Sequence, residues 1–358
     1  MPKKPFFSFV IPTFNRAEDL RFALYCILRQ TFSDFEIVVS DNCSEDNTLD
    51  IVESFKSKKI RYFKNKTNIG VLPNVKKSIS YAEGEYVFLH SDDDFLLYES
   101  SLRDIYENIK KNKPGYLRVN YITRTPDKKR LFRYHGNTPS KNNNKLAANV
   151  SSDKVLSFIL TTDPGFITGL VFKNNLPKDV NVIDSDPFWV IKILFYTTKK
   201  WGGYFVAKPH LIASWSTWRV NKNNFNQIYS IIDGKLHSEP YFNFIKARLN
   251  KTSYEYFLHR QLMEIYILRF PAIKYYTGSN NTMLLSKRIR KLDGTFDSSL
   301  YFWIYYGLAL ILPRVALRFI KDVAFYKYSR FSKTKDDKGA SRDLKKLEGE
   351  YLHDKVNN

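Results

Sequence analysis

The stretch that decides the fold is Leu89-His90-Ser91-Asp92-Asp93-Asp94, which directly follows the strand-like segment Glu85-Tyr86-Val87-Phe88. Three neighbouring carboxylates at a strand end repel one another and raise each other's pKa. A bound divalent cation removes that cost, and aspartate oxygens suit Mg²⁺ or Mn²⁺, which in turn hold phosphate oxygens. Taken alone, an Asp-Asp-Asp run would indicate a solvated acidic turn, so the surrounding sequence has to decide between the two interpretations.

The segments before this acidic run alternate between strand and helix patterns. Strand patterns occur at residues 6–11, 35–39, 60–63 and 85–88, and helix patterns at 19–29, 49–56 and about 72–82. This order predicts a largely parallel sheet, in which ligands bind at the carboxyl ends of the strands. Asn15, Asp41 and Gly70 each follow a predicted strand, as the acidic run does, so we expect one crevice to collect them.

Four segments resemble the nucleotide-sugar-binding half of the family 2 glycosyltransferases, which have the GT-A fold. They are Phe9–Arg16 (FVIPTFNR), Val38–Thr48 (VVSDNCSEDNT), Asn68–Gly70 (NIG) and Ala82–Asp94 (AEGEYVFLHSDDD). All four, in order and at the family's spacing, make a specific signal. It is clear over residues 6–98, moderate to about residue 220 and absent beyond. The resemblance implies an α/β GT-A fold, Rossmann-like, with a mostly parallel sheet flanked by helices.

The resemblance also implies roles for single residues. Those expected around the donor nucleotide are Pro12, Thr13, Asn15, Arg16, Asp41, Asn68, Gly70, Asp92 and Asp93. The metal, Mn²⁺ or Mg²⁺, would be held by Asp94 and Asp92. Asp41 is suited to accept a hydrogen bond from a uracil or thymine N–H, which favours a UDP- or dTDP-type donor.

In the family an acidic residue at a helix start is the catalytic base, and Asp186 is the best match to that position. Pro187 suits the first turn of the predicted helix, so Asp186 would be its N-cap. The same placement is explained equally by a plain helix cap. Asp184 remains the alternative base, because the local pattern departs from that of the family.

The composition is that of a globular protein, with 358 residues, 43% of them hydrophobic and 26% charged. Cys26 and Cys43 cannot form a disulfide framework and are expected to be free thiols. His90 is expected to be a packed strand residue, because the histidines show no metal-ligand spacing.

The predicted division is a GT-A catalytic domain at 1–220 (nucleotide-sugar binding at 1–98, acceptor side at 99–220), a helical C-terminal region at 221–330, and a polar charged tail, mobile or weakly helical, at 331–358.

A net charge of +21 calls for an anionic partner. No nucleic-acid-binding module occurs and the acidic run argues against one, so no nucleic acid is expected.

The apolar stretch at 300–312 (LYFWIYYGLALIL) is shorter than a membrane span, which needs about 20 residues, and its Tyr and Trp favour the membrane interface. The flanking cations are Lys287, Arg288, Arg290, Lys291, Arg314, Arg318, Lys321, Lys327, Arg330, Lys333 and Lys335.

This pattern predicts amphipathic helices that lie on an anionic membrane surface. The alternative is a helix buried in a core. Because residues 1–4 run straight into the first predicted strand, no signal peptide is expected. We therefore expect a peripheral protein on the cytoplasmic face of the cell membrane.

Together these features predict a metal-dependent inverting glycosyltransferase that moves one sugar from a nucleotide-sugar donor to a glycan acceptor in cell-surface polysaccharide synthesis. We expect that acceptor to be lipid-linked. No Gln-x-x-Arg-Trp sequence of the processive synthases occurs, which favours single addition. A sugar-phosphate nucleotidyltransferase is one alternative, although Pro12–Arg16 replaces the Gly-rich loop of those enzymes. A non-enzymatic, basic membrane-binding protein is another.

Overall fold

The computed structural model describes residues 4–124, 131–132, 142–162, 164–176, 189–214, 229, 231–313, 315–317 and 335–357. These residues belong to two compact units. The first holds the described residues up to 214 together with those from 335 onward, and the second holds those from 229 to 317. The chain therefore leaves the first unit, builds the second, and returns to the first.

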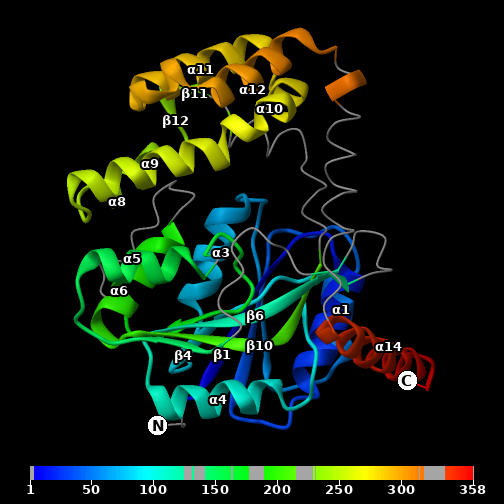
Figure 1. The fold of residues 1–358 in the computed structure, drawn as a ribbon. Helices are drawn as coiled ribbons and strands as arrows, with labels where there is room; N and C mark the ends of the chain where they lie inside the picture. The colour runs from blue at the N-terminus through cyan, green and yellow to red at the C-terminus, as the bar shows by residue number, and fades with distance from the viewer. Residues whose placement is uncertain are drawn as a thin grey trace. The chain divides into compact units, whose positions relative to one another are not determined.

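The N-terminal half of the first unit is a parallel sheet, as predicted. Its strands are β1 (Phe7–Thr13), β2 (Phe35–Asp41), β3 (Ile60–Lys64) and β4 (Tyr86–Leu89), in the spatial order β3-β2-β1-β4. Helices α1 (Ala17–Leu28), α2 (Thr48–Ser54) and α3 (Val71–Ser80) connect them (Figure 1). Every residue of β2 and β4 is buried, as in parallel strands covered on both faces.

The sheet then continues with strands of mixed direction. Strand β9 (Leu170–Lys173) lies antiparallel between β4 and β6 (Tyr116–Arg124), and β10 (Gly203–Ser214) runs parallel to β6. The remaining elements are β5 (Phe95–Leu96), β7 (Leu131–Phe132), β8 (Asn144–Leu146), α4 (Ser101–Asn112), α5 (Ser152–Leu160) and α6 (Trp189–Trp201).

Strand β10 is long and pairs irregularly with β6, with register shifts between Val206 and Leu211. Pro209 disturbs this ladder without ending the strand, so the residues on either side of it keep pairing. The start of β10 also pairs antiparallel with β8.

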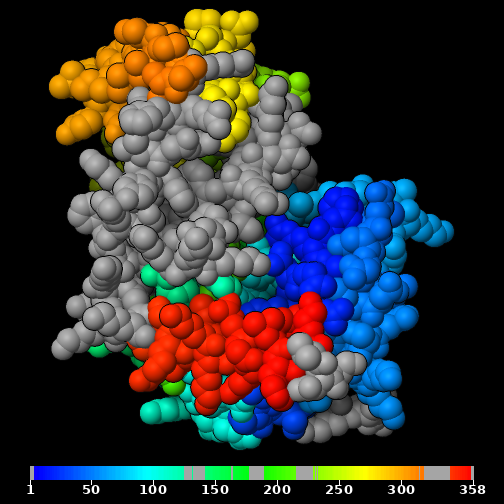
Figure 2. All heavy atoms as spheres, turned by 90° about the vertical axis from the view of Figure 1, so that its right-hand side faces the viewer, coloured from blue at the N-terminus to red at the C-terminus, as the bar shows by residue number. Residues whose placement is uncertain are grey.

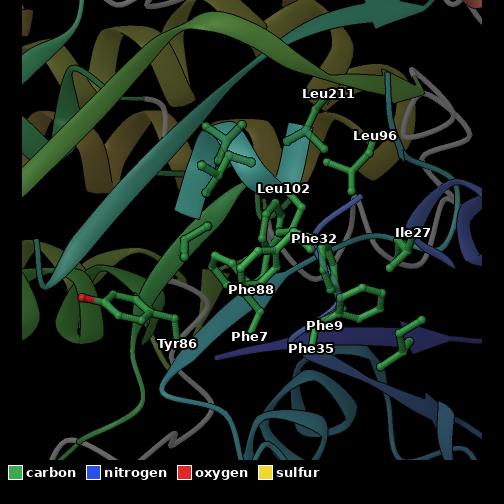
Figure 3. Packing of buried hydrophobic residues seen from close by; sticks show 14 of the residues in the cluster. Phe7, Phe9, Ile27, Phe32, Phe35, Tyr86, Phe88, Leu96, Leu102 and Leu211 are labelled. Carbon is green, nitrogen blue, oxygen red and sulfur yellow. The ribbon is translucent and has the colours of Figure 1, made fainter. Parts of the chain in front are cut away.

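Aromatic side chains from the first strands build the main core of this unit (Figure 3). Phe9 stacks on Phe88 of the neighbouring β4 with ring centroids 4.6 Å apart, and Phe7 packs against Phe32. Offset and edge-to-face pairs of this kind add to the free energy gained from burial. The rigid core thus fixes where β1 and β4 end, which is where the predicted site residues begin.

The segment expected to be a mobile or weakly helical tail is a helix, α14 (Lys335–Asn357), that packs on the first unit (Figures 1 and 2). Ala340, Leu344 and Leu347 are buried in a second core with residues from α1, β5 and β6. Polar contacts flank them: Tyr25 donates to Asp354 over 2.7 Å, Arg29 pairs with Glu350 at 2.9 Å, and Lys355 pairs with Glu18 at 2.7 Å.

The second unit is helical. Its elements are β11 (Ile231–Ile232), β12 (Lys235–Leu236), α8 (Glu239–Lys246), α9 (Lys251–Ile265), η2 (Ile267–Arg269), α10 (Phe270–Thr277), α11 (Ser279–Leu292), η3 (Gly294–Ser298) and α12 (Leu300–Ile311). Arg288 of α11 bonds to both carboxylate oxygens of Glu239. Phe270, Phe296 and Phe302 form its aromatic centre.

The apolar stretch at 300–312 is largely helix α12, which buries Phe302 and Ala309 but exposes most of its other large apolar side chains. The exposed ones are Leu300, Tyr301, Trp303, Ile304, Leu308, Leu310 and Ile311. This exposure does not fit a helix buried in a core. No helix among the described residues combines the length and the apolar character that crossing a bilayer requires.

We predict that Leu344→Ala lowers the free energy of unfolding of the first unit by about 2–4 kcal/mol, because it opens a cavity under α14. Leu352→Ala on the same helix is the matched control, since Leu352 is 59% exposed whereas Leu344 is 5% exposed. Urea denaturation followed by circular dichroism measures both. Equal stability of the two variants would contradict the docking of α14.

Candidate active site

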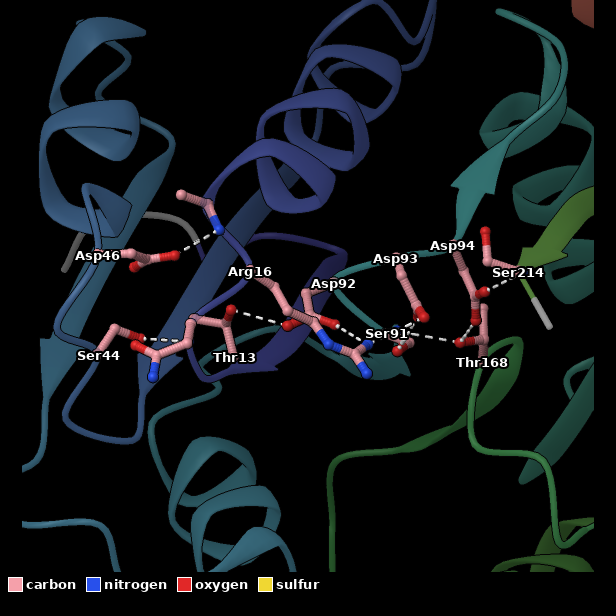
Figure 4. A network of polar contacts seen from close by, with 12 residues as sticks. Thr13, Arg16, Ser44, Asp46, Ser91, Asp92, Asp93, Asp94, Thr168 and Ser214 are labelled. Carbon is pink, nitrogen blue, oxygen red and sulfur yellow. Dashed lines mark hydrogen bonds and ion pairs between the residues drawn. The ribbon is translucent and has the colours of Figure 1, made fainter. Parts of the chain in front are cut away.

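Most of the described residues that were predicted to bind the donor or the metal lie at the carboxyl ends of β1 to β4, and Figure 4 shows those around Asp92–Asp94. Thr13 Oγ1 donates to Asp92 Oδ2 over 2.8 Å. Arg16 Nη1 lies 3.1 Å from Asp92 Oδ1 and 2.9 Å from Asp93 Oδ2. The loop after β1 and the acidic run after β4 are therefore in direct contact, as their positions at neighbouring strand ends predict.

Every carboxylate oxygen of the acidic run accepts a hydrogen bond. Besides the bonds from Thr13 and Arg16, Ser91 Oγ donates to Asp93 Oδ1 over 2.6 Å. Asp94 accepts from the backbone N–H of Ser214 at 2.6 Å and from the hydroxyl of Thr168. Six oxygens are thus held by five residues from separate parts of the chain, which orients all three carboxylates.

Burial and mutual repulsion disfavour the ionised form of the carboxylates in the acidic run. Burial and the neighbouring charge of Asp93 raise the pKa of Asp92 to about 7, although Arg16 and Thr13 oppose the shift. Burial and Asp93 likewise raise the pKa of Asp94 well above its usual range. A cation in or beside the run would lower these pKa values and favour the ionised carboxylates.

On the other side of the site, at the ends of β2 and β3, asparagine side chains form a hydrogen-bond network. Asn42 donates to Asn68 Oδ1 over 2.7 Å and accepts from the backbone N–H of Ile69 at 3.0 Å. Gly70 follows with φ of +88°, a backbone conformation that favours glycine, and helix α3 begins directly after it. These contacts fix the Asn68–Gly70 loop.

Asp41 is fully buried at the end of β2. Its Oδ1 accepts the backbone N–H of Ser44 at 2.8 Å, and its Oδ2 accepts the Tyr62 hydroxyl. Asn15, which has φ of +51°, donates its backbone N–H to Ser44 Oγ and accepts from the N–H of Glu45. Asp41 and Asn15 therefore both shape the Asn42–Glu45 turn beside the β1 loop, whereas Pro12 lies within β1.

Several residues of the site were missing from the sequence prediction. Thr168 and Ser214 hold Asp94, yet neither is charged or next to another predicted ligand. The one signal for Thr168 is the pair of glycines, Gly165 and Gly169, on either side of it, because glycine lets the backbone approach a ligand closely. Ser214 becomes recognisable only when β5, directly after Asp94, is seen to pair with β10.

The remaining predictions concern His90, the two base candidates and the two cysteines. His90 is buried with its ring edge-on to Phe9 and Phe88, and burial lowers its pKa to about 4, so the expected packed role is confirmed. Asp186 and Asp184 lie outside the described residues. Both cysteines are free, as expected. Within the described part of the chain, no cluster of three or more His, Cys, Asp or Glu side chains is arranged to hold a metal ion.

A sheet of this order, with an acidic run at the end of β4, defines an α/β fold of the GT-A type. The structure of Staphylococcus aureus TarS 1-349 in complex with UDP-GlcNAc has this fold, with a TM-score of 0.54 over 85% of this chain and 90% of that one, at 17% identity. Residues 8–162 match Glycosyl transferase family 2. The N-terminal part of this chain is thus similar to that family.

Two relatives extend the comparison. The GalNAc(5)-diNAcBac-PP-undecaprenol beta-1,3-glucosyltransferase of Campylobacter jejuni is 41% identical over 101 residues, which are 27% of this chain and 31% of the relative. The poly(ribitol-phosphate) beta-N-acetylglucosaminyltransferase TarP of S. aureus is 26% identical over 242 residues, 63% of this chain and 69% of TarP. The chain thus matches about a third of the first relative's length. Both relatives are named as glycosyltransferases.

Proposed function

We propose that this protein is an inverting glycosyltransferase that transfers one sugar from a nucleotide-sugar donor to a glycan or lipid-linked acceptor in cell-surface polysaccharide synthesis. The observation that carries the proposal is the buried acidic run Asp92–Asp94, held by the β1 loop at the carboxyl ends of parallel strands. The family of residues 8–162 supports the same activity.

The proposed donor is a UDP- or dTDP-sugar, bound by Pro12, Thr13, Asn15, Arg16, Asp41, Asn68, Gly70, Asp92 and Asp93. Asp41 would accept the N–H of the base while keeping its bonds to Ser44 and Tyr62, because a carboxylate has about four acceptor sites. The relative TarP, named for N-acetylglucosamine transfer, and the TarS structure with UDP-GlcNAc support a uridine nucleotide.

Mn²⁺ or Mg²⁺ is the proposed cofactor, and the residues present fit it in chemistry. The acidic run offers hard oxygen donors, and burial together with the neighbouring charge of Asp93 raises the pKa of Asp92 and of Asp94, a cost that a bound cation would lower. Asp94 and Asp92 would hold the cation, with phosphate oxygens and water completing its shell. When bound, the cation neutralises charge on the departing nucleoside diphosphate.

The acceptor hydroxyl requires a base on the face of the sugar opposite to the diphosphate. Asp186 is the proposed base and Asp184 the alternative. The carboxylate accepts the hydroxyl proton while the oxygen attacks the anomeric carbon, which inverts the configuration there.

The proposed acceptor is membrane-linked, and helix α12 supports this location with its exposed apolar side chains. Lys287 and Lys291, also exposed, precede it in the sequence. Such a helix can lie in the headgroup region of an anionic bilayer. The Campylobacter relative, named for an undecaprenol-linked substrate, supports a lipid-linked acceptor. The proposed location of this protein is the cytoplasmic face of the membrane.

We predict that Asp94→Asn abolishes turnover and weakens binding of UDP in the presence of Mn²⁺ by at least about tenfold, because it removes a charged cation ligand. Folding should be retained, since asparagine can still accept the Ser214 N–H. Calorimetry with and without Mn²⁺ measures the binding. Equal UDP affinity in wild type and variant would refute the metal assignment.

We predict that Asp186→Asn leaves UDP binding unchanged and slows transfer to the acceptor by about 10²–10⁴-fold, as expected for loss of a general base. Asp184→Asn is the matched control. If Asp186 is only a helix cap, its variant stays active and loses about 1 kcal/mol of stability. Loss of transfer in Asp184→Asn alone would reassign the base.

We predict that the protein sediments with anionic vesicles at low salt and is released by high salt, and that Ile311→Glu weakens this binding about tenfold by placing a charge in the apolar face of α12. Leu352→Glu is the control, an equally drastic change at an exposed leucine of α14. Binding that ignores lipid charge, salt and Ile311→Glu would argue against membrane association.

A further inference from the structure

Arg16 stands apart from the other residues that donate to the acidic run (Figure 4). Its side chain is 39% exposed, whereas those of Asp92 and Asp93 are 6% exposed. The other donors are hydroxyls of Thr13, Ser91 and Thr168 and one backbone N–H. Arg16 is thus the one charged donor among those described, and it reaches the carboxylates from the solvent side.

The contact between Arg16 and the carboxylates has a geometry that another cation could replace. One nitrogen, Nη1, serves both carboxylates, at 3.1 and 2.9 Å, so the guanidinium does not form the two-nitrogen fork of a strong arginine–carboxylate pair. No described residue accepts a hydrogen bond from Nε or Nη2 of Arg16. These donors remain available to an oxyanion such as a phosphate.

The backbone of Arg16 is held independently of its side chain. Its carbonyl accepts the N–H of Leu20 at 2.9 Å and so begins α1, and the neighbouring Ala17 donates its N–H to Asp46 at 3.0 Å. The guanidinium can therefore leave the acidic run by rotation of side-chain bonds, without any loss of the helix start.

A divalent cation and the guanidinium compete for the same place. Arg16 occupies Asp92 Oδ1 and Asp93 Oδ2, and the other donors that the described residues bring to the run are neutral. A cation that binds the acidic run would therefore lie close to the positively charged guanidinium of Arg16, which contacts two of the six carboxylate oxygens. Like charges at hydrogen-bond distance repel strongly in a partly buried site.

We propose that Arg16 is a built-in counter-ion of the acidic run, which a divalent cation displaces and which then turns its free nitrogens to the phosphates of the bound nucleotide. This inference rests on the proposed metal-dependent donor binding. It gives Arg16 two successive partners, carboxylates in the ligand-free protein and phosphate oxygens in the complex. Metal binding and diphosphate binding are thereby coupled through one side chain.

The test is a titration of the full chain with Mn²⁺ alone, in which the electron paramagnetic resonance signal reports free Mn²⁺. Arg16→Met should bind Mn²⁺ about tenfold more tightly than wild type, because its competitor is gone. Arg16→Lys, which keeps the charge, should stay near wild type. Arg21→Met is the matched control: it removes one positive charge from the same helix, at a residue paired with Glu18.

A second measurement covers the other half of the exchange. With saturating Mn²⁺, calorimetry should show UDP binding to Arg16→Met about tenfold more weakly than to wild type or Arg21→Met. Mn²⁺ should also raise the melting temperature of Arg16→Met more than that of wild type, which shows in addition that the variant folds.

Two results would overturn the inference. If Arg16→Met binds Mn²⁺ no more tightly than Arg21→Met while wild type still needs Mn²⁺ for UDP, Arg16 is no competitor and the proposed metal dependence stands. If wild type binds UDP equally with and without Mn²⁺, the metal dependence fails and the counter-ion exchange fails with it.

Discussion

Placing three consecutive carboxylates in a protein interior is the constraint on which the rest of this structure depends. Buried charges are costly unless each is paired or hydrogen-bonded. Here the donors come from the end of β1, the start of α1, the turn before β9 and the end of β10. The sheet order brings these four places together, and the two-residue strand β5 fixes the distance between Asp94 and Ser214 by pairing with β10.

The site has two parts that are built differently. The part around Asp92–Asp94 relies on donors that reach in from several elements. The part beside β2 and β3 is built mainly from asparagine amides: Asn65 bonds to Asn42 and Asn74, and Asn74 bonds to Ser40. Lys77 also donates to Asn65. A buried polar network whose members are all hydrogen-bonded is rigid, so this part holds the Asn68–Gly70 loop in place.

How far the sequence predicts this structure depends on the kind of signal. Parallel strands buried on both faces leave continuous apolar runs, so β1 to β4 and the residues after them are predictable. Strand β5 is too short to leave a pattern in the sequence. Because β5 is what brings β10 next to Asp94, the contact between Ser214 and Asp94 cannot be predicted either. Helix α14 is masked by its charged composition, yet Ala340, Leu344, Leu347 and Tyr351 have helical spacing and predict one apolar stripe. The base candidates Asp184 and Asp186 stay predictions.

The return of the chain to the first unit has a consequence for biosynthesis. A ribosome makes α14 only after it has made the whole second unit, so the nascent first unit lacks its last helix for more than a hundred residues of translation. During that time Phe22, Tyr25 and Phe95 lack the cover that α14 provides. Exposed aromatic surface on a nascent chain attracts chaperones and favours aggregation. The first unit can therefore complete its folding only after the second unit has been synthesised. A messenger RNA truncated within the second unit would yield a first unit without the helix that covers these side chains.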